Sequence, residues 1–363
     1  MKKIYPTLLI IFALLLAVLT ACGQSTTPNN TEPSPTPTAA PIATPTPIPT
    51  PVPQADVFAL TADMPGYISL GFIHTLNDEF YNRLPFTYTE LGAAMWIADT
   101  LLHMGHPAEN IQIQSFSWED TVPLQAFIRL PDVETAVSMF AGHADDARNY
   151  SQNVILTVPG RSDSTRTIIV GAHYDSVYTP GASDNASGTA LLMESAYRLL
   201  HQDNYYTILY IFFGAEEIGL LGAYYFIEGL SQSKLDDIIV MINADVLIES
   251  GRSGFGTTQI VDYEHVENNV TAQINAIAQG LADSHGIYLI NEHRLTRMGS
   301  DHLPFVEAGL SVVVLASLDI AVLHTPYDCI HYLNERWPGM VDEVMWRFSI
   351  FLDKMLMEIS AMY

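Results

Sequence analysis

Short apolar runs rich in β-branched residues restrict the possible fold of this chain more than any other feature. Such runs predict buried strands of a largely parallel sheet, because strands covered on both faces carry apolar side chains almost continuously. Helical periodicity falls between and around them, which indicates an α/β fold. The predicted strands are Asn153–Val158, Thr167–Ala172, Thr207–Phe213, Ile238–Ile242 and Ser311–Ala316, and the predicted helices are Glu90–His103, Gly188–Leu200, Gly219–Gly229, Val270–His285 and Gly339–Met357.

Polar side chains follow three of the predicted strands. His173 ends the second strand, Glu216 and Glu217 follow the third, and Asp245 follows the fourth. We expect a central mixed, mostly parallel β-sheet with helices on both faces. Open sheets of this kind bind ligands at the carboxyl ends of their strands. The four side chains should therefore converge in one crevice.

The N-terminal residues are typical of a targeting signal. Lys2 and Lys3 precede an apolar run from Leu8 to Leu19, which is too short to span a bilayer but suits a signal peptide. The sequence LTAC at 19–22 resembles a bacterial lipobox. We therefore expect a lipoprotein signal peptide over 1–21 and a lipid on Cys22 that anchors the chain to the membrane, on the extracytoplasmic side of a bacterial cell envelope. An ordinary secretory signal is the alternative.

A proline-rich tract follows the signal. Residues 24–54 hold ten of the 21 prolines, alternate them with Thr and carry one charged residue, Glu32. This composition favours extended polyproline II and cannot form a core, so we expect residues 22–54 to act as a spacer. A protein-binding PxxP ligand is the alternative. No second linker interrupts 55–363, which we interpret as one domain.

The charge balance and the cysteine count exclude several classes. The chain has 15 Lys and Arg against 40 Asp and Glu, a net charge of −25. No nucleic-acid partner is expected, because phosphate binding needs a basic surface. Two cysteines exclude a disulfide scaffold and a Cys-rich zinc module.

Several side chains have the chemistry of metal ligands. Asp175 lies two residues after His173 and can accept the second ring N–H, which would fix the tautomer of a ligand. Asp184 lies on a loop that opens a helix, from which a carboxylate can bridge two cations. Glu216 and Glu217 are neighbours whose side chains diverge, so one can bind a metal while the other faces a bound water.

A complete ligand set emerges when Asp245 and His324 are added. Two His, two Asp and one Glu, without thiolate, suit Zn²⁺, with Mn²⁺ or Co²⁺ possible. Five ligands that include one bridge fit a two-metal site, which would activate water and polarise a carbonyl.

Five blocks in order resemble the co-catalytic di-zinc aminopeptidase family, the bacterial secreted leucine-aminopeptidase type of zinc exopeptidase. They are GAHYDS, GASDNASG, FFGAEEIGLLGA, NAD, and GSDHLPF followed by HTPYD, from Gly171 to Asp328. The resemblance implies a di-zinc peptidase domain over 55–363 with the zinc-exopeptidase, phosphorylase/hydrolase-like fold. It also implies hydrolysis of N-terminal residues from extracellular peptides.

The resemblance implies a role for each matching residue. His173 and Asp245 would hold one zinc, Glu217 and His324 the other, and Asp184 would bridge them. Glu216 would be the general base that takes a proton from the bridging water and delivers it to the leaving amine, and Asp175 would assist catalysis by orienting His173. A cis peptide would follow Asp184.

Two further positions are expected near the reaction. Asp301 resembles an acid that lies near the active site of the family, and we expect it to support the ligands, while we expect His302 to line the cleft. Leu323 departs from the pattern, because some relatives carry an aromatic residue before the final His. We interpret the glycine-rich segment Gly251–Gly256 as a loop beside the cleft.

Three other functions stay open at this point. Glutaminyl-peptide cyclotransferases look similar, although they typically carry Trp where this chain has Leu323. A carboxypeptidase is a close variant within the wider family. A degenerate lipoprotein that binds peptides is the non-enzymatic alternative. For the leading function we expect peptide substrates and a monomer.

Overall fold

The computed structural model describes residues 64–121, 130–141, 146–161, 163–202, 204–249, 252–258 and 269–361, all of which lie within one compact unit, Pro53–Tyr363. The predicted signal peptide, Cys22 and the proline-rich spacer lie outside the described residues. Of the helices in these ranges, none is both long and apolar enough to cross a bilayer.

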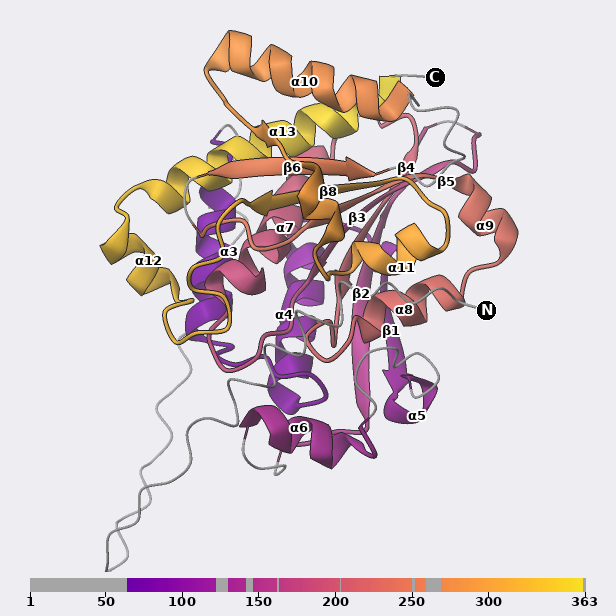
Figure 1. Ribbon diagram of the computed structural model, residues 1–363. Helices are drawn as coiled ribbons and strands as arrows, with labels where there is room; N and C mark the ends of the chain where they lie inside the picture. The colour runs from indigo at the N-terminus through magenta and orange to yellow at the C-terminus, as the bar shows by residue number, and fades with distance from the viewer. Residues whose placement is uncertain are drawn as a thin grey trace, which may run out of the picture. The chain divides into compact units, whose positions relative to one another are not determined.

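Eight strands within the described ranges form a mixed sheet in the order β1-β2-β4-β3-β5-β8-β6-β7 (Figure 1). The central strands β4, β3, β5 and β8 are parallel to one another, whereas β2 and β6 pair antiparallel with β4 and β8. The mostly parallel sheet is thus confirmed. The strands are β1 (Ile111–Ser117), β2 (Tyr150–Val158), β3 (Thr167–His173), β4 (Thr207–Phe213), β5 (Ile238–Ala244), β6 (Ser253–Thr258), β7 (Ile290–Asn291) and β8 (Val312–Ser317).

Helices cover both faces of the sheet, as predicted. Successive strand residues point to opposite faces, so each face has its own apolar core. Val170 and Ile242 pack with α3, α4, α7, α10 and α13, while Ile169 and Met241 pack with α8 and α11 on the other face. The helices are α3 (Tyr67–Asp78), α4 (Tyr88–His103), α5 (Trp118–Thr121), α6 (Val133–Ala141), α7 (Gly188–Leu199), α8 (Leu221–Glu228), α9 (Gln232–Asp237), α10 (Asn269–His285), α11 (His302–Glu307), α12 (Ile330–Arg336) and α13 (Met340–Ala361).

The glycine-rich segment corrects one prediction. Most of Gly251–Gly256 belongs to β6, which pairs with β8, and is not a loop beside the cleft. A Cβ at Gly254 would lie 2.7 Å from Leu318 Cδ2 and 2.9 Å from the carbonyl oxygen of Ile290. Glycine is therefore needed here for close packing within the sheet rather than for a turn.

Candidate metal centre

The predicted site residues lie at one edge of the sheet, where neighbouring parallel strands end. Because β4, β3, β5 and β8 are adjacent and parallel, their carboxyl ends lie side by side. An irregular helical turn, Ala182–Ser187, leads into α7 at the same edge. The residues brought together are His173 at the end of β3, Asp184 in that turn, Glu216 and Glu217 after β4, Asp245 after β5 and His324 after β8.

Asp184 lies between two imidazoles. Its Oδ1 is 3.1 Å from His173 Nε2, and its Oδ2 is 3.1 Å from His324 Nε2. Each imidazole also faces a second carboxylate. Asp245 Oδ1 is 3.2 Å from His173 Nε2, and Glu217 Oε2 is 2.9 Å from His324 Nε2. The peptide bond after Asp184 is cis, as the resemblance implied.

The possible ligand atoms form two groups. Within each group the atoms lie within 4.8 Å of one another, and the groups are His173, Glu216 and Asp245, and Asp184, Glu217 and His324. Two ligands of a tetrahedral zinc ion are about 3.3 Å apart, close to the separations given above. Glu217 Oε1 is buried and has no hydrogen-bond partner. The donor set therefore fits divalent cations of the zinc type.

The pKa values of the two imidazoles also indicate a site that requires positive charge. Burial lowers the pKa of His173, but Glu216 and Asp245 outweigh it and raise that pKa well above the ordinary value. Glu217 likewise raises the pKa of His324. Protons on the two imidazoles thus supply positive charge that the carboxylates require. Bound cations would displace these protons, because metal ligands must be deprotonated.

Asp175 positions more than one neighbour. Its backbone carbonyl accepts the hydrogen bond from His173 Nδ1 at 3.2 Å, and its carboxylate Oδ1 is 3.5 Å from the same nitrogen. The two carboxylate oxygens also accept hydrogen bonds from the backbone N–H groups of Glu216 and Glu217, at 3.2 and 3.1 Å. This fully buried carboxylate therefore links the end of β3 to the turn after β4.

Asp301 and His302 are both fully buried. Neither oxygen of Asp301 has a hydrogen-bond partner. Burial raises the pKa of Asp301 well above its usual value, and His173 opposes that effect. Burial lowers the pKa of His302 to about 4, so its imidazole is neutral at pH 7. The His302 ring has no exposed surface, and its Nε2 lies 3.2 Å from the backbone carbonyl oxygen of Thr296.

Arg83 is a supporting residue that the sequence does not reveal. The side chain is fully buried and donates hydrogen bonds to the carbonyl oxygens of Tyr174, Pro180 and Gly181, at 2.5, 2.7 and 3.1 Å. Burial lowers its pKa to about 10, and the charges of Asp175 and others oppose this effect. Arg83 therefore brings a positive charge that interacts with the carboxylates of the centre, and its hydrogen bonds hold the loop that leads to Asp184.

Asp328 holds the bridging residue in place. Its carboxylate accepts hydrogen bonds from the backbone N–H groups of Ser183, at 2.6 Å, and Asp184, at 3.0 Å. Gly181, just before this turn, has φ +59°, and a Cβ there would lie 2.2 Å from the carbonyl oxygen of Asp184. The position of Asp328 in the HTPYD block is the sequence signal for this role.

Glu90 supports the other side of the centre. It was predicted only as the start of a helix, but its buried Oε1 accepts hydrogen bonds from Ser151 Oγ at 2.6 Å and from the backbone N–H of Ala215 at 3.2 Å.

Three residues around the centre have a left-handed backbone. Ala215 has φ +55°, and Val246 and His324 have φ values of +52° and +53°. Residues other than glycine in the left-handed region are strained, and such strain clusters at functional sites.

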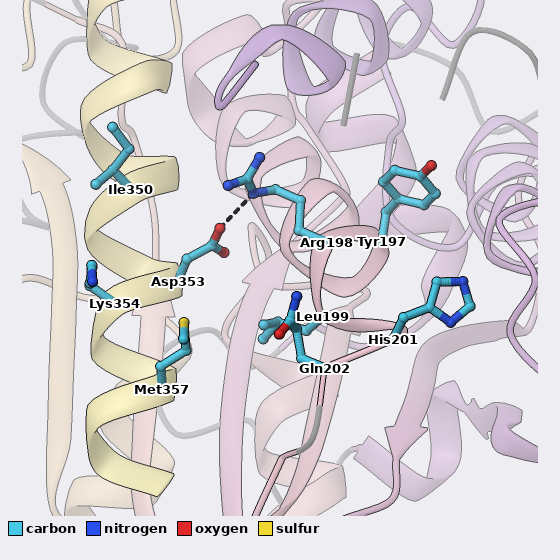
Figure 2. Close-up of a pocket in the computed structure, with 9 residues that line it drawn as sticks. All are labelled: Tyr197, Arg198, Leu199, His201, Gln202, Ile350, Asp353, Lys354 and Met357. Atoms are coloured by element: carbon cyan, nitrogen blue, oxygen red, sulfur yellow. Dashed lines mark hydrogen bonds and ion pairs between the residues drawn. The ribbon is translucent and has the colours of Figure 1, made fainter. Parts of the chain in front are cut away.

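A separate cavity of about 450 Å³ lies between the end of α7 and α13 (Figure 2). It is lined by Tyr197, Arg198, Leu199, His201, Gln202, Ile350, Asp353, Lys354 and Met357. Arg198 Nε donates a hydrogen bond to Asp353 Oδ2 at 2.5 Å on its wall. No lining residue belongs to either ligand group, so this cavity is not the candidate metal centre.

Comparison with known sequences finds one peptidase family and several aminopeptidases. The model of peptidase family M28 matches residues 153–349. Aminopeptidase YwaD of Bacillus subtilis (strain 168) is 32% identical over 194 residues, which are 51% of this chain and 41% of YwaD. The probable lipoprotein aminopeptidase LpqL of Mycobacterium tuberculosis is 38% identical over 101 residues, 27% of this chain and 20% of LpqL. The chain thus spans less than half the length of either relative.

Solved structures share the fold. BSAP, a zinc aminopeptidase from Bacillus subtilis, superposes with a TM-score of 0.59 at 18% identity, over 79% of this chain and 95% of its own. The glutaminyl cyclase of an Acidobacteriales bacterium superposes with a TM-score of 0.57 at 17% identity, over 82% of this chain and 96% of its own. An aminopeptidase and a cyclase therefore have the same architecture as this chain.

Proposed function

We propose that this chain, which belongs to peptidase family M28, is a zinc-dependent aminopeptidase. Its reaction would remove N-terminal residues from extracellular peptides. The observation that carries the proposal is the position of Asp184, whose two oxygens each face a different imidazole. The relatives and the structural neighbour that are named aminopeptidases support it.

Two zinc ions would be held by five residues. His173 and Asp245 would hold one ion, Glu217 and His324 the other, and Asp184 would contact both. Zinc bound in such a site acidifies water and polarises a carbonyl group. Asp175 would keep the His173 ring and the backbone of the two glutamates in position, through the contacts described above.

Glu216 would transfer the proton. Its Oε2 lies 4.0 Å from His173 Nε2, whereas Asp184 and Asp245 lie 3.1 and 3.2 Å from that nitrogen. The greater distance favours a base over a ligand. Glu216 would take a proton from the attacking water and deliver it to the leaving amine. Asp245 and Glu216 are also our candidates to hold the free amine of the substrate.

The test is hydrolysis of a panel of peptides by the zinc-loaded chain, with and without a chelator. We expect cleavage of peptides with a free N-terminus, no cleavage of N-acetylated ones, loss of activity with 1,10-phenanthroline and recovery with zinc. Release of ammonia from N-terminal Gln peptides without cleavage would instead identify a cyclase, an enzyme class that shares this fold. Cleavage of blocked peptides from the other end would identify a carboxypeptidase.

We further propose that a lipid on Cys22 anchors the enzyme to the outer side of a bacterial membrane. The lipobox-like sequence at 19–22 supports this, and so does the name of LpqL. Mass spectrometry of the chain purified from a bacterial membrane should find residues 1–21 removed and Cys22 acylated. A chain that begins elsewhere, or an unmodified Cys22, would contradict the anchor.

A further inference from the structure

A second cluster of metal-ligating side chains lies away from the candidate metal centre. His74 and Asp78 are four residues apart on one face of α3, and His331 is on α12, beside it (Figure 1). His331 Nε2 is 2.9 Å from Asp78 Oδ1, and His74 Nδ1 is 3.9 Å from Asp78 Oδ2. The two imidazole rings have their centroids 5.7 Å apart. One possible ligand atom from each residue lies within 4.8 Å of the others.

An ordinary surface ion pair does not account for this arrangement. A single imidazole would satisfy one oxygen of the Asp78 carboxylate, but a second imidazole faces the other oxygen from a distance too long for a hydrogen bond. Two imidazoles and one carboxylate around a common point are the donor set that zinc and similar divalent ions prefer. The strong negative charge of the chain also favours a bound cation.

A buried residue holds the carboxylate in position. Asn77 Nδ2 donates a hydrogen bond to Asp78 Oδ1 at 2.6 Å, and Asn77 Oδ1 accepts one from the backbone N–H of Ile330 at 2.9 Å. The same amide therefore orients Asp78 and links the end of α3 to the first residue of α12, which precedes His331. Such supporting hydrogen bonds are a regular feature of metal sites, because they fix the direction of the ligands.

We propose that His74, Asp78 and His331 form a further metal site, which takes a divalent transition-metal ion of the zinc type and ties α3 to α12. The side chains are 43%, 44% and 64% exposed, so the ion is accessible from solvent and keeps a water ligand. The helix α12 begins two residues after Asp328, which holds the backbone of Asp184. The bound ion stabilises this junction and is not part of the catalytic chemistry.

The first experiment counts zinc ions. The native full chain, the variants His331→Ala and His74→Ala, and the control His103→Ala are each loaded with two equivalents of zinc and then titrated with further Zn²⁺ by calorimetry. His103 is an exposed residue at the end of α4, so its loss should change nothing. We expect one binding event that is present in the native chain and in His103→Ala, and that is weakened at least about 10-fold in the other two variants. Equal binding in all four proteins, or no such event in the native chain, would overturn the proposal.

The second experiment measures stability. Addition of further Zn²⁺ to the native chain loaded with two equivalents of zinc should raise Tm by about 3–5 °C, and the rise should vanish in His331→Ala and in Asp78→Asn. Two variants on different helices guard against misfolding of one of them. An equal rise in the variants would refute the site. Both readouts are differences between variants, so they hold even if the chain proves to lack peptidase activity.

Discussion

Buried carboxylates occur in two regions of the molecule under opposite conditions. Glu194 on α7 accepts hydrogen bonds from the backbone N–H groups of Gly66 and Ser69, at 2.6 and 2.8 Å, and from the hydroxyls of Ser69 and Ser349, at 2.7 and 2.8 Å. At the candidate metal centre, both oxygens of Asp301 and one oxygen of Glu217 have no hydrogen-bond partner.

The difference distinguishes a carboxylate that stabilises the fold from carboxylates that are available to bind cations. A buried carboxylate costs free energy unless donors or cations receive it. Around Glu194 the fold supplies four donors, three from the start of α3 and one from α13, so this carboxylate joins helices. At the candidate metal centre the fold gathers acids with too few donors, which makes sense if cations complete the site. Each prediction below tests one side of this contrast.

The largest effect is expected for Asp184→Asn. An amide bridges two cations poorly, because it offers one oxygen and no charge, so metal should be lost and activity should fall by more than about 1,000-fold. Elemental analysis and peptide hydrolysis measure the two effects. Asp319→Asn, at an exposed ion pair with Arg252, is the matched control and should keep both. Unchanged zinc content in Asp184→Asn would remove the bridge from the proposal.

Glu216→Gln should separate proton transfer from ligation. We expect full zinc content and a decrease in kcat of about 100- to 10,000-fold, the usual contribution of a general base. Kinetics and elemental analysis of the same preparation measure kcat and the zinc content. Loss of zinc would make Glu216 a ligand, and normal turnover would exclude it from the mechanism.

Glu194→Gln should destabilise the metal-free chain by about 2–3 kcal/mol, because the new amide group would face N–H and O–H donors. Asp301→Asn is the matched substitution at the candidate metal centre and should cost much less, since its oxygens have no hydrogen-bond partner to lose. Urea unfolding of both variants provides the free energies of unfolding. Equal losses would show that the contrast between the two regions is wrong.

Asp175→Asn should lower zinc affinity by about 10- to 100-fold, the usual effect of a residue that supports a ligand. The amide cannot accept hydrogen bonds from both backbone N–H groups, so the turn that carries Glu216 and Glu217 loosens. Zinc titration against a competing chelator measures the change. An affinity equal to that of the native chain would limit Asp175 to an ordinary loop acid.

The smallest effect concerns His106, a buried group outside both regions. Burial lowers its pKa to about 4, while a hydrogen bond with the backbone of Ala196 opposes this and His201 adds to it. The folded state therefore favours the neutral ring. Its stabilisation is complete above pH 6.5 and is lost as the pH falls towards 4, by about 1–2 kcal/mol at pH 5. His106→Gln should flatten this part of the pH profile of unfolding, and an unchanged slope would contradict it.

The main strands, and the polar side chains that follow them, were predictable because both depend on local patterns. A strand buried on both faces needs an unbroken apolar run, and β3, β4 and β5 have one. Their order in the sheet brings His173, Glu217 and Asp245 together, so the ends of three runs already indicated the candidate metal centre. The edge strand β1 was missed because most of its residues are exposed or half-buried, which leaves no continuous apolar run.

The supporting residues could be found only in the folded chain. Arg83 reaches the loop before Asp184 from nearly one hundred residues away, and Asp328 binds the same turn from 144 residues away. His74 meets His331 across more than 250 residues. Hydrogen bonds and ligand contacts of this kind depend on which elements pack together and leave no periodic pattern along the chain. Local sequence thus specifies the strands and the polar side chains at their ends. Tertiary packing decides which distant side chains hold those polar groups in position.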